Sequence, residues 1–169
     1  VTYQMLPSDI VANDDGGKTA AWAKQHGQTL SANNDSGEDW SGCRDIDHNS
    51  ENVRNNYNAY LKFLVEDLGY TGFRYDMVKG YAAKFVGQYN QAAQPQFSVG
   101  EYWDDSDHIK TWILKTRINN VPQSAAFDFP FRYTVRDAAN SGDWSKLKNE
   151  SNVPLVSENR FRRYAVIVA

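Results

Sequence analysis

Two hydrophobic periods alternate in the middle of this chain, and together they predict a β-α-β unit. Residues 72–76 alternate aromatic positions with Arg74 and Asp76, as expected for a half-buried strand. Over 81–89 the apolar positions recur every three or four residues, which predicts a helix. A proline ends this helix pattern, and 97–101 (FSVGE) then has the composition of a second short strand.

The segments on either side of this unit differ in their patterns. Ser50 is typical of a helix N-cap, and an apolar stripe from Val53 to Leu68 predicts a helix that ends at Gly69. Further helices are predicted over 18–25, from Ser106 onward, and over 131–139 with a stop at Gly142. The first 45 residues are rich in Asn, Asp, Gly and Ser, so they are expected to be largely irregular.

Each of the two predicted strands ends in a carboxylate, Asp76 and Glu101, which lie 25 positions apart. This spacing is long enough for a helical crossover between parallel strands. Because parallel strands end at the same edge of a sheet, the two acids are expected to converge there. Cleavage of a glycosidic bond needs two carboxyl groups that flank the bond. For cleavage with retention, those groups are expected about 5–5.5 Å apart.

A structural interpretation competes with this chemistry. Arg74 and Asp76 share one face of the first strand, so they can also form an ion pair that only stabilises the fold. Taken alone, Glu101 would usually be interpreted as an acidic residue on the surface. The combination of the two strand ends favours the catalytic interpretation.

Four segments resemble the alpha-amylase family of glycoside hydrolases. Residues 72–81 (GFRYDMVKGY) and 99–104 (VGEYWD) resemble the family's fourth-strand and fifth-strand motifs, and 45–48 (DIDH) resembles the return from its domain B. Residues 125–138 resemble the sixth strand and the helix after it. The resemblance implies an α/β fold, a partial TIM-type β/α barrel of about strands 4 to 7. Domain boundaries follow, with a domain B-like irregular segment over 1–45 and partial catalytic barrel over 46–169.

The resemblance also implies roles in catalysis. Asp76 matches the nucleophile, which forms a covalent glycosyl-enzyme, and Glu101 matches the acid/base. Arg74 matches the arginine that keeps the nucleophile ionised. A nearby opposite charge favours a carboxylate, so Asp76 is expected to be anionic while Glu101 stays protonated.

Substrate and calcium positions follow in the same way. Lys79 matches a position that contacts sugar beyond the cleaved bond, and the rings of Tyr102 and Trp103 are expected to stack on sugar. Asp45 matches a calcium-ligand aspartate, and Gly80 matches a position that binds the ion through its backbone carbonyl. Calcium is therefore the expected cofactor, since it prefers oxygen ligands.

A turn or a cap can also explain the acids near this site. Asp45 and Asp47 can cap the helix that follows them. Asp14 and Asp15 superficially resemble a calcium loop but lack its ligand spacing, so they are expected to form a turn.

Two family motifs are missing from the sequence. The third-strand motif, an Asp followed by Asn-His, has no counterpart, and 163–169 resembles the seventh strand without its Asn-His-Asp. A complete β/α barrel takes about 250 residues and at least about 200, whereas this chain has 169. We therefore expect an internal fragment of a longer, monomeric protein, with little or no activity by itself.

Composition excludes some partners. The net charge of −3 argues against nucleic acid, and no apolar run approaches the ~18 residues needed to cross a bilayer. With one cysteine, the chain has no internal disulfide. The expected reaction is hydrolysis of internal α-1,4 glucosidic bonds in starch, amylose or maltooligosaccharides. Because starch lies outside most cells that digest it, the enzyme is expected to be secreted or held in the cell envelope.

Two alternatives remain open. A transglycosylase or a debranching enzyme of the same family would share both acids, and product analysis on amylose and branched glucan would separate these activities. A catalytically inactive carbohydrate-binding fragment would lack reducing-sugar release altogether.

Overall fold

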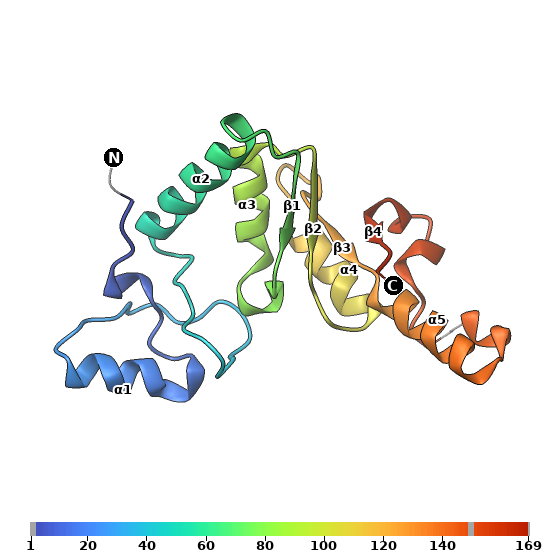
Figure 1. The fold of residues 1–169 in the computed structure, drawn as a ribbon, viewed down its shortest axis with the longest axis horizontal. Coiled ribbons are helices and arrows are strands. Elements are labelled where there is room, and N and C mark those ends of the chain that lie inside the picture. The colour runs from blue at the N-terminus through green and yellow to red at the C-terminus, as the bar shows by residue number, and fades with distance from the viewer. Residues whose placement is uncertain (1–2, 149–150, 169) are drawn as a thin grey trace.

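The computed structural model describes residues 3–148 and 151–168, and its centre is a parallel sheet (Figure 1). The strands in the described residues are β1 (Gly72–Tyr75), β2 (Phe97–Gly100), β3 (Ala125–Phe127) and β4 (Ala165–Val166). Their order in the sheet is their order in the chain, and every neighbouring pair is parallel. This α/β arrangement fits a partial β/α barrel, as the sequence predicts. The numbering of the strands as 4 to 7 and the domain boundary at residue 45 remain predictions.

The register aligns the carboxyl ends of the strands. Tyr75 pairs with Gly100, and Gly100 pairs with Ala126. Phe127 pairs with Val166 at the far side of the sheet. The residue after each strand therefore emerges at one common edge, where the candidate catalytic acids were expected. Ala169, the last residue of the predicted seventh strand, lies outside the described residues.

Helices connect these strands. They are α1 (Lys18–Gln25), α2 (Glu51–Glu66), α3 (Ala83–Ala93), α4 (Ser106–Lys115) and α5 (Phe129–Ser141). The sequence predicts the bounds of α1 and the start of α4, and Ser50 caps α2 by accepting a hydrogen bond from the Val53 N–H at 3.3 Å. The helix predicted over 131–139 is longer than expected because Asp128 caps it with a bond from the Phe131 N–H.

Short 3-10 helices occupy several of the connections. They span Pro7–Asp9, Asp15–Gly17, Val78–Gly80, Trp144–Leu147, Leu155–Ser157 and Arg162–Tyr164.

The main core lies between the sheet and the helices after β1, β2 and β3. Its buried members include Val78, Val86, Ile109, Trp112, Ile113, Ala126, Phe129 and Leu155. A second cluster of Leu61, Phe85, Tyr89 and Ala93 joins α2 to α3. The apolar stripes of α3 and α4 thus face the sheet or the neighbouring helix, whereas Tyr60 of the α2 stripe is 57% exposed.

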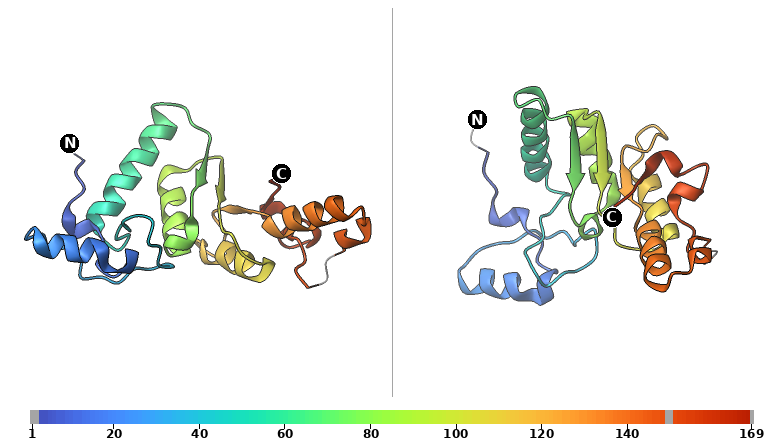
Figure 2. Two further views of the ribbon diagram at one scale, coloured as in Figure 1. Left: turned by 60° about the horizontal axis from the view of Figure 1, so that its bottom comes forward. Right: turned by 45° about the vertical axis from the view of Figure 1, so that its right-hand side comes forward.

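Residues 3–50 form a largely irregular segment that lies beside the strand ends. In Figures 1 and 2, α1 lies away from the sheet and α5 lies at the opposite end of the molecule. Backbone bonds from the Val11 N–H to the Asp45 carbonyl (3.1 Å) and from the Ser31 N–H to the Ile10 carbonyl (2.9 Å) close the segment on itself. Asp47 is buried beneath it and accepts bonds from Ser31.

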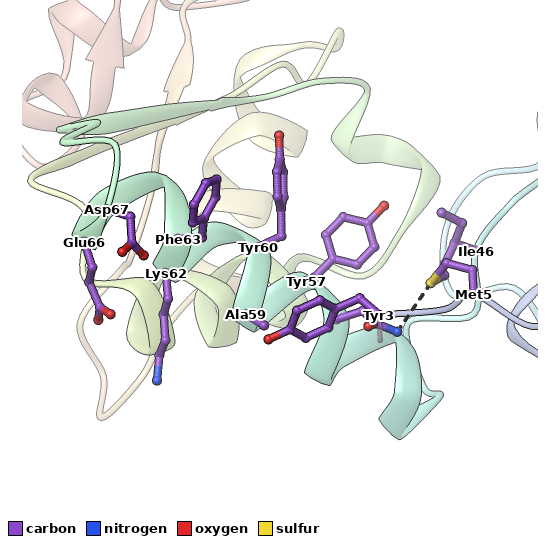
Figure 3. A pocket seen from close by; sticks show the side chains of 11 residues that line it. Tyr3, Met5, Ile46, Tyr57, Ala59, Tyr60, Lys62, Phe63, Glu66 and Asp67 are labelled. Atoms are coloured by element: carbon purple, nitrogen blue, oxygen red, sulfur yellow. Dashed lines mark hydrogen bonds between the residues drawn. The ribbon is translucent and has the colours of Figure 1, made fainter. Parts of the chain in front are cut away.

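An apolar cavity of about 750 Å³ lies on the face of α2 that carries Tyr57, Tyr60 and Phe63 (Figure 3). Tyr3 and Met5 of the N-terminal segment complete its lining. None of the candidate catalytic residues lines it, so the chemistry has to be sought elsewhere. None of the helices in the described parts of the chain combines the length and apolar character that crossing a membrane requires.

Candidate active site

Arg74 holds Asp76 and Glu101 at the same time. Its Nη1 lies 2.8 Å from Asp76 Oδ1, and its Nη2 lies 2.8 Å from Glu101 Oε1. The β1–β2 register places both acids at the same sheet edge, and the Glu101 N–H extends the ladder with a 2.9 Å bond to the Tyr75 carbonyl. Arginine suits this position because its planar fork presents several donors in fixed directions. The three residues proposed for catalysis therefore meet in one place.

The turn after Asp76 is built around Glu101. Met77 adopts a left-handed conformation (φ 42°, ψ 49°), which is uncommon for a residue with a side chain. Its N–H donates to Glu101 Oε2 at 3.3 Å, and the Val78 N–H donates to the Glu101 carbonyl at 3.2 Å. The turn thus directs two backbone donors at Glu101, one to its carboxylate and one to its backbone carbonyl.

The pKa of Glu101 is lowered in this site. Partial burial acts to raise it, but hydrogen bonds from Trp103, Asp76 and the Met77 backbone, together with the charge of Arg74, outweigh burial. The expectation of a protonated Glu101 is therefore wrong for the free site. The reason is that hydrogen bonds from Trp103, Asp76 and the Met77 N–H, ahead of the charge of Arg74, favour the carboxylate.

Trp103 contacts both the catalytic acid and the core. A side-chain hydrogen bond links it to Glu101. Its ring stacks on Phe129 with centroids 3.7 Å apart and an interplanar angle of 21°, and the Arg132 guanidinium lies 5.6 Å from the Trp103 ring centroid. With 44% of its surface exposed, Trp103 still presents area to a sugar.

A cavity of about 370 Å³ connects this site to the N-terminal segment. Glu101, Trp103 and Lys79 line it together with the candidate calcium positions Asp45 and Gly80. Residues predicted to act in catalysis and sugar binding therefore line the same cavity as residues predicted to bind calcium. Trp40 of the N-terminal segment, which is 49% exposed, also belongs to the lining.

Lys79 is a central residue of this cavity. Its Nζ lies 2.9 Å from Asp104 Oδ2 and 3.2 Å from Glu38 Oε1. The hydrogen bond to Asp104 raises the pKa of Lys79, against partial burial, and Glu38 adds to the increase. The side chain is therefore a firmly charged donor that two acids hold in place.

Tyr102 lies beside Lys79, whose Nζ is 5.3 Å from the Tyr102 ring centroid. It lines a neighbouring cavity together with Lys79, Thr111 and Trp112, and its contact with sugar stays a prediction. The alternation of side chains along extended backbone explains this placement, because Glu101 and Trp103 point to one side and the residue between them to the other.

Three acids that the sequence argument did not assign to a cation lie beside Asp45. Carboxylate oxygens of Asp14, Asp35 and Asp39 lie within 4.8 Å of one another. Burial, followed by a hydrogen bond with Asp35 and the charges of Asp35 and Asp14, raises the pKa of Asp45 to about 8. The predicted turn at Asp14 exists, since the Asp14 carbonyl accepts the Gly17 N–H at 2.9 Å, but the same residue also belongs to this cluster.

The cluster fits a hard cation. Oδ2 of Asp35 is buried, and no donor reaches it among the described residues unless Asp45 is protonated. Such an arrangement of crowded carboxylates is costly unless a positive charge or a proton neutralises it. Asp45 and Gly80 line the same cavity as Asp14 and Asp39.

Asp47 and His48 have structural roles. Asp47 accepts bonds from Ser31 Oγ and Asn33 Nδ2, both 2.7 Å, and from the Asn49 N–H at 2.8 Å. His48 bonds Tyr89 at 2.7 Å. Burial lowers the pKa of His48 to about 4, against the charge of Asp47. The capping interpretation therefore holds in part for Asp47, whereas Asp45 belongs to the acidic cluster.

The fold and the site define a class of protein, namely a parallel β/α enzyme segment with paired carboxylates at its strand ends. No family profile matches the chain. Among curated proteins, it is 32% identical over 137 residues to Probable alpha-amylase 2 of Arabidopsis thaliana, covering 72% of this chain and 32% of that protein.

Two further relatives agree. Alpha-amylase 3, chloroplastic, of Arabidopsis thaliana is 39% identical over 72 residues (43% of this chain, 8% of that protein). Glucan 1,4-alpha-maltohexaosidase of Bacillus sp. (strain 707) is 27% identical over 121 residues (68% of this chain, 23% of that protein). The chain spans about a third or less of the length of these relatives. It belongs to the alpha-amylase family of glycoside hydrolases.

Proposed function

We propose that Asp76, Glu101 and Arg74 form the catalytic centre of a retaining glycoside hydrolase that cleaves internal α-1,4 glucosidic bonds. The observation that carries the proposal is the single guanidinium that holds both carboxylates, each at 2.8 Å. This arrangement gathers the two acids that retention requires around one point. The activity proposed is that of the longer protein to which this chain corresponds.

The reaction proceeds in two displacements. Asp76 attacks the anomeric carbon and forms a glycosyl ester, while Glu101 gives its proton to the departing glycosidic oxygen. Glu101 then takes a proton from water, and the resulting hydroxide attacks the same carbon and releases Asp76. Two inversions leave the configuration of the product unchanged.

Glu101 has to gain its proton when substrate binds. Burial is the largest single influence on its pKa and acts upward, although donors outweigh it in the free site. A sugar seated between the acids expels water and strengthens the contribution of burial. The glycosidic oxygen also competes for the donors that now favour the carboxylate. Binding therefore raises the pKa toward the range a general acid needs.

Starch, amylose or a maltooligosaccharide is the proposed substrate. Lys79 and Trp103 line the cavity beside Glu101 and present a charged donor and an aromatic surface to sugar. The name of the Bacillus relative, a glucan 1,4-alpha-maltohexaosidase, supports an α-1,4 glucan. Export of the enzyme to the place where polymeric glucan is digested is part of the same proposal.

Calcium is proposed for the acidic cluster. Asp45, the Gly80 carbonyl and the carboxylates of Asp14, Asp35 and Asp39 would hold it. When bound, the ion supplies a charge that cross-links the irregular segment to the turn after β1. None of the catalytic steps above depends on it.

The stereochemistry of the first product tests the proposal in the enzyme that contains this chain. Proton NMR of maltooligosaccharide hydrolysis should show α-anomers before mutarotation, whereas β-anomers would indicate inversion and overturn the mechanism. Asp76→Asn should reduce kcat by about a thousandfold or more. Asp107→Asn on the exposed side of α4 is the matched control and should leave kcat unchanged. Residual activity of Asp76→Asn above about a tenth of wild type would exclude Asp76 as nucleophile.

A further inference from the structure

Trp40 presents a large aromatic surface beside the catalytic centre. The residue is 49% exposed, and it lines the cavity of about 370 Å³ that Glu101 and Lys79 also line. Binding sites for small molecules typically measure about 300–1,000 Å³, so the cavity is large enough for a ligand. Trp40 belongs to neither of the two hydrophobic clusters, so core packing does not account for its side chain.

Trp40 differs in this respect from Trp103, the other tryptophan in the lining. The Trp103 ring stacks on Phe129 with centroids 3.7 Å apart, so part of its surface is already covered by the core. Within the described part of the chain, no aromatic ring stacks on Trp40 and no cationic group lies over it. The indole therefore keeps apolar area that the C–H groups of a sugar ring can contact.

Two contacts fix the position of Trp40. Its backbone N–H donates to Asp14 Oδ1 at 2.8 Å. Gly42 lies so close to the indole that a Cβ there would overlap the six-membered ring. A surface that is held in place before the ligand arrives loses little conformational freedom on binding, and this favours affinity.

The cavity lies on the side of the departing sugar. Of the two catalytic acids, Glu101 lines it and Asp76 does not. In the proposed reaction Glu101 protonates the departing oxygen, whereas Asp76 attacks the anomeric carbon from the other side. Lys79 lines the cavity as well, and its ammonium group can donate hydrogen bonds to sugar hydroxyls. The cavity can therefore receive the part of the glucan that leaves first.

We propose that Trp40 stacks on a glucose unit of the departing part of the glucan and thereby selects substrates with a sugar at that position. The inference rests on the proposed function, since it names the part of the substrate that this cavity holds. It gives the irregular N-terminal segment, which carries none of the three proposed catalytic residues, a direct role in the choice of substrate.

Two substrates with different leaving groups test the proposal in the enzyme that contains this chain. Maltoheptaose has a sugar as its leaving group, whereas α-maltotriosyl fluoride releases fluoride and places no sugar beyond the cleaved bond. Trp40→Ala should lower kcat/KM about tenfold for maltoheptaose and by less than about twofold for the fluoride. Trp144→Ala, at an exposed position after α5, is the matched control and should equal wild type on both substrates.

Two further variants separate stacking from a role in folding. Trp40→Tyr keeps an aromatic ring and should retain at least about a third of the wild-type kcat/KM for maltoheptaose. Gly42→Ala keeps the indole but displaces it, so it should lower kcat/KM for maltoheptaose and leave fluoride release unchanged.

The outcomes distinguish this inference from the proposed function. If Trp40→Ala reduced activity equally on both substrates, or on neither, the stacking role would be overturned. If the wild-type enzyme released no fluoride, or Asp76→Asn released as much as wild type, the proposed function itself would be wrong, and this inference would be lost with it.

Discussion

Gly37 packs directly against the backbone of Gly80, so closely that a Cβ on Gly37 would overlap the Gly80 carbonyl carbon. Beside this contact, the Glu38 N–H donates to the Lys79 carbonyl at 2.9 Å. The irregular N-terminal segment is therefore fastened to the turn that follows the nucleophile strand. Any change that separates them should disturb the acidic cluster and the catalytic cavity together.

Gly37→Ala should destabilise the protein. The added methyl has to displace backbone rather than a flexible side chain, and overpacking of this kind costs about 1–3 kcal/mol. We expect a lower free energy of unfolding in urea and a smaller stabilisation by added calcium, because the segment that carries all four acids of the proposed calcium site is displaced. Chemical denaturation with and without calcium measures both effects.

Gly80→Ala is the matched control for this experiment. A Cβ at Gly80 meets nothing within 4 Å, although the residue lies on the other side of the same contact. Its carbonyl stays in place, so the free energy of unfolding should change by no more than about 0.5 kcal/mol. Equal destabilisation by the two variants would show that the close approach of Gly37 does not matter.

Trp103→Phe should raise the pKa of Glu101. The substitution removes the indole N–H that hydrogen-bonds Glu101 but keeps an aromatic ring to stack on Phe129. Without that donor, the upward effect of burial on the carboxyl is less strongly opposed. The titration of Glu101, followed by carbon NMR with labelled glutamate, should shift to higher pH.

Trp144→Phe controls for the loss of a tryptophan in general. Trp144 lies at the start of a 3-10 helix and is 62% exposed. Its replacement should leave the Glu101 titration unchanged. A Glu101 titration that is the same in Trp103→Phe and wild type would mean that Trp103 does not support the carboxylate.

The βα units and the convergence of the acids follow from local patterns. The alternation before Asp76 predicts β1, and parallel pairing then brings Glu101 to the same edge whatever the details of the helix between them. The alternation rule would also have placed Tyr102 away from Glu101. Its role in sugar binding stays a prediction, and its contact in the structure is with Lys79.

The acidic cluster could not be predicted in the same way. Asp14, Asp35 and Asp39 come from irregular segments, and no periodicity relates them to Asp45. Their approach depends on isolated bridges between distant residues, such as Val11 with Ser31. Long-range closure of this kind leaves no local pattern in the sequence.

His48 should make the protein less stable as the solution becomes acidic. Burial lowers its folded-state pKa to about 4, below the ordinary value of 6.5. Between those two pH values the unfolded chain binds a proton that the folded chain does not. Stability is therefore lost as pH falls through this window, by about 3 kcal/mol for the full shift. Urea unfolding at pH 7, 5.5 and 4.5 measures it.

The contribution of His48 is isolated with His48→Gln, which cannot titrate in this range but can still bond the Tyr89 hydroxyl. The difference in unfolding free energy between wild type and variant should shrink from pH 7 to pH 4.5. A difference that is constant with pH would mean that the buried imidazole has an ordinary pKa.

Cation binding should release a proton from Asp45. Burial and the neighbouring Asp35 and Asp14 raise its pKa to about 8, so the cation-free folded protein keeps this proton at neutral pH. Since the unfolded chain loses it near pH 4, this contribution to stability is present at low pH and is lost as pH rises through about 8. Calcium needs the ionised carboxylate, so its affinity should rise over the same range.

Titration calorimetry at pH 6.5 in two buffers of different ionisation enthalpy should show about one proton released for each ion bound. At pH 9.5, and in Asp45→Asn at both pH values, the release should be close to zero. If Asp45→Asn released as many protons as wild type, the proton would have to belong to another carboxyl group of the cluster.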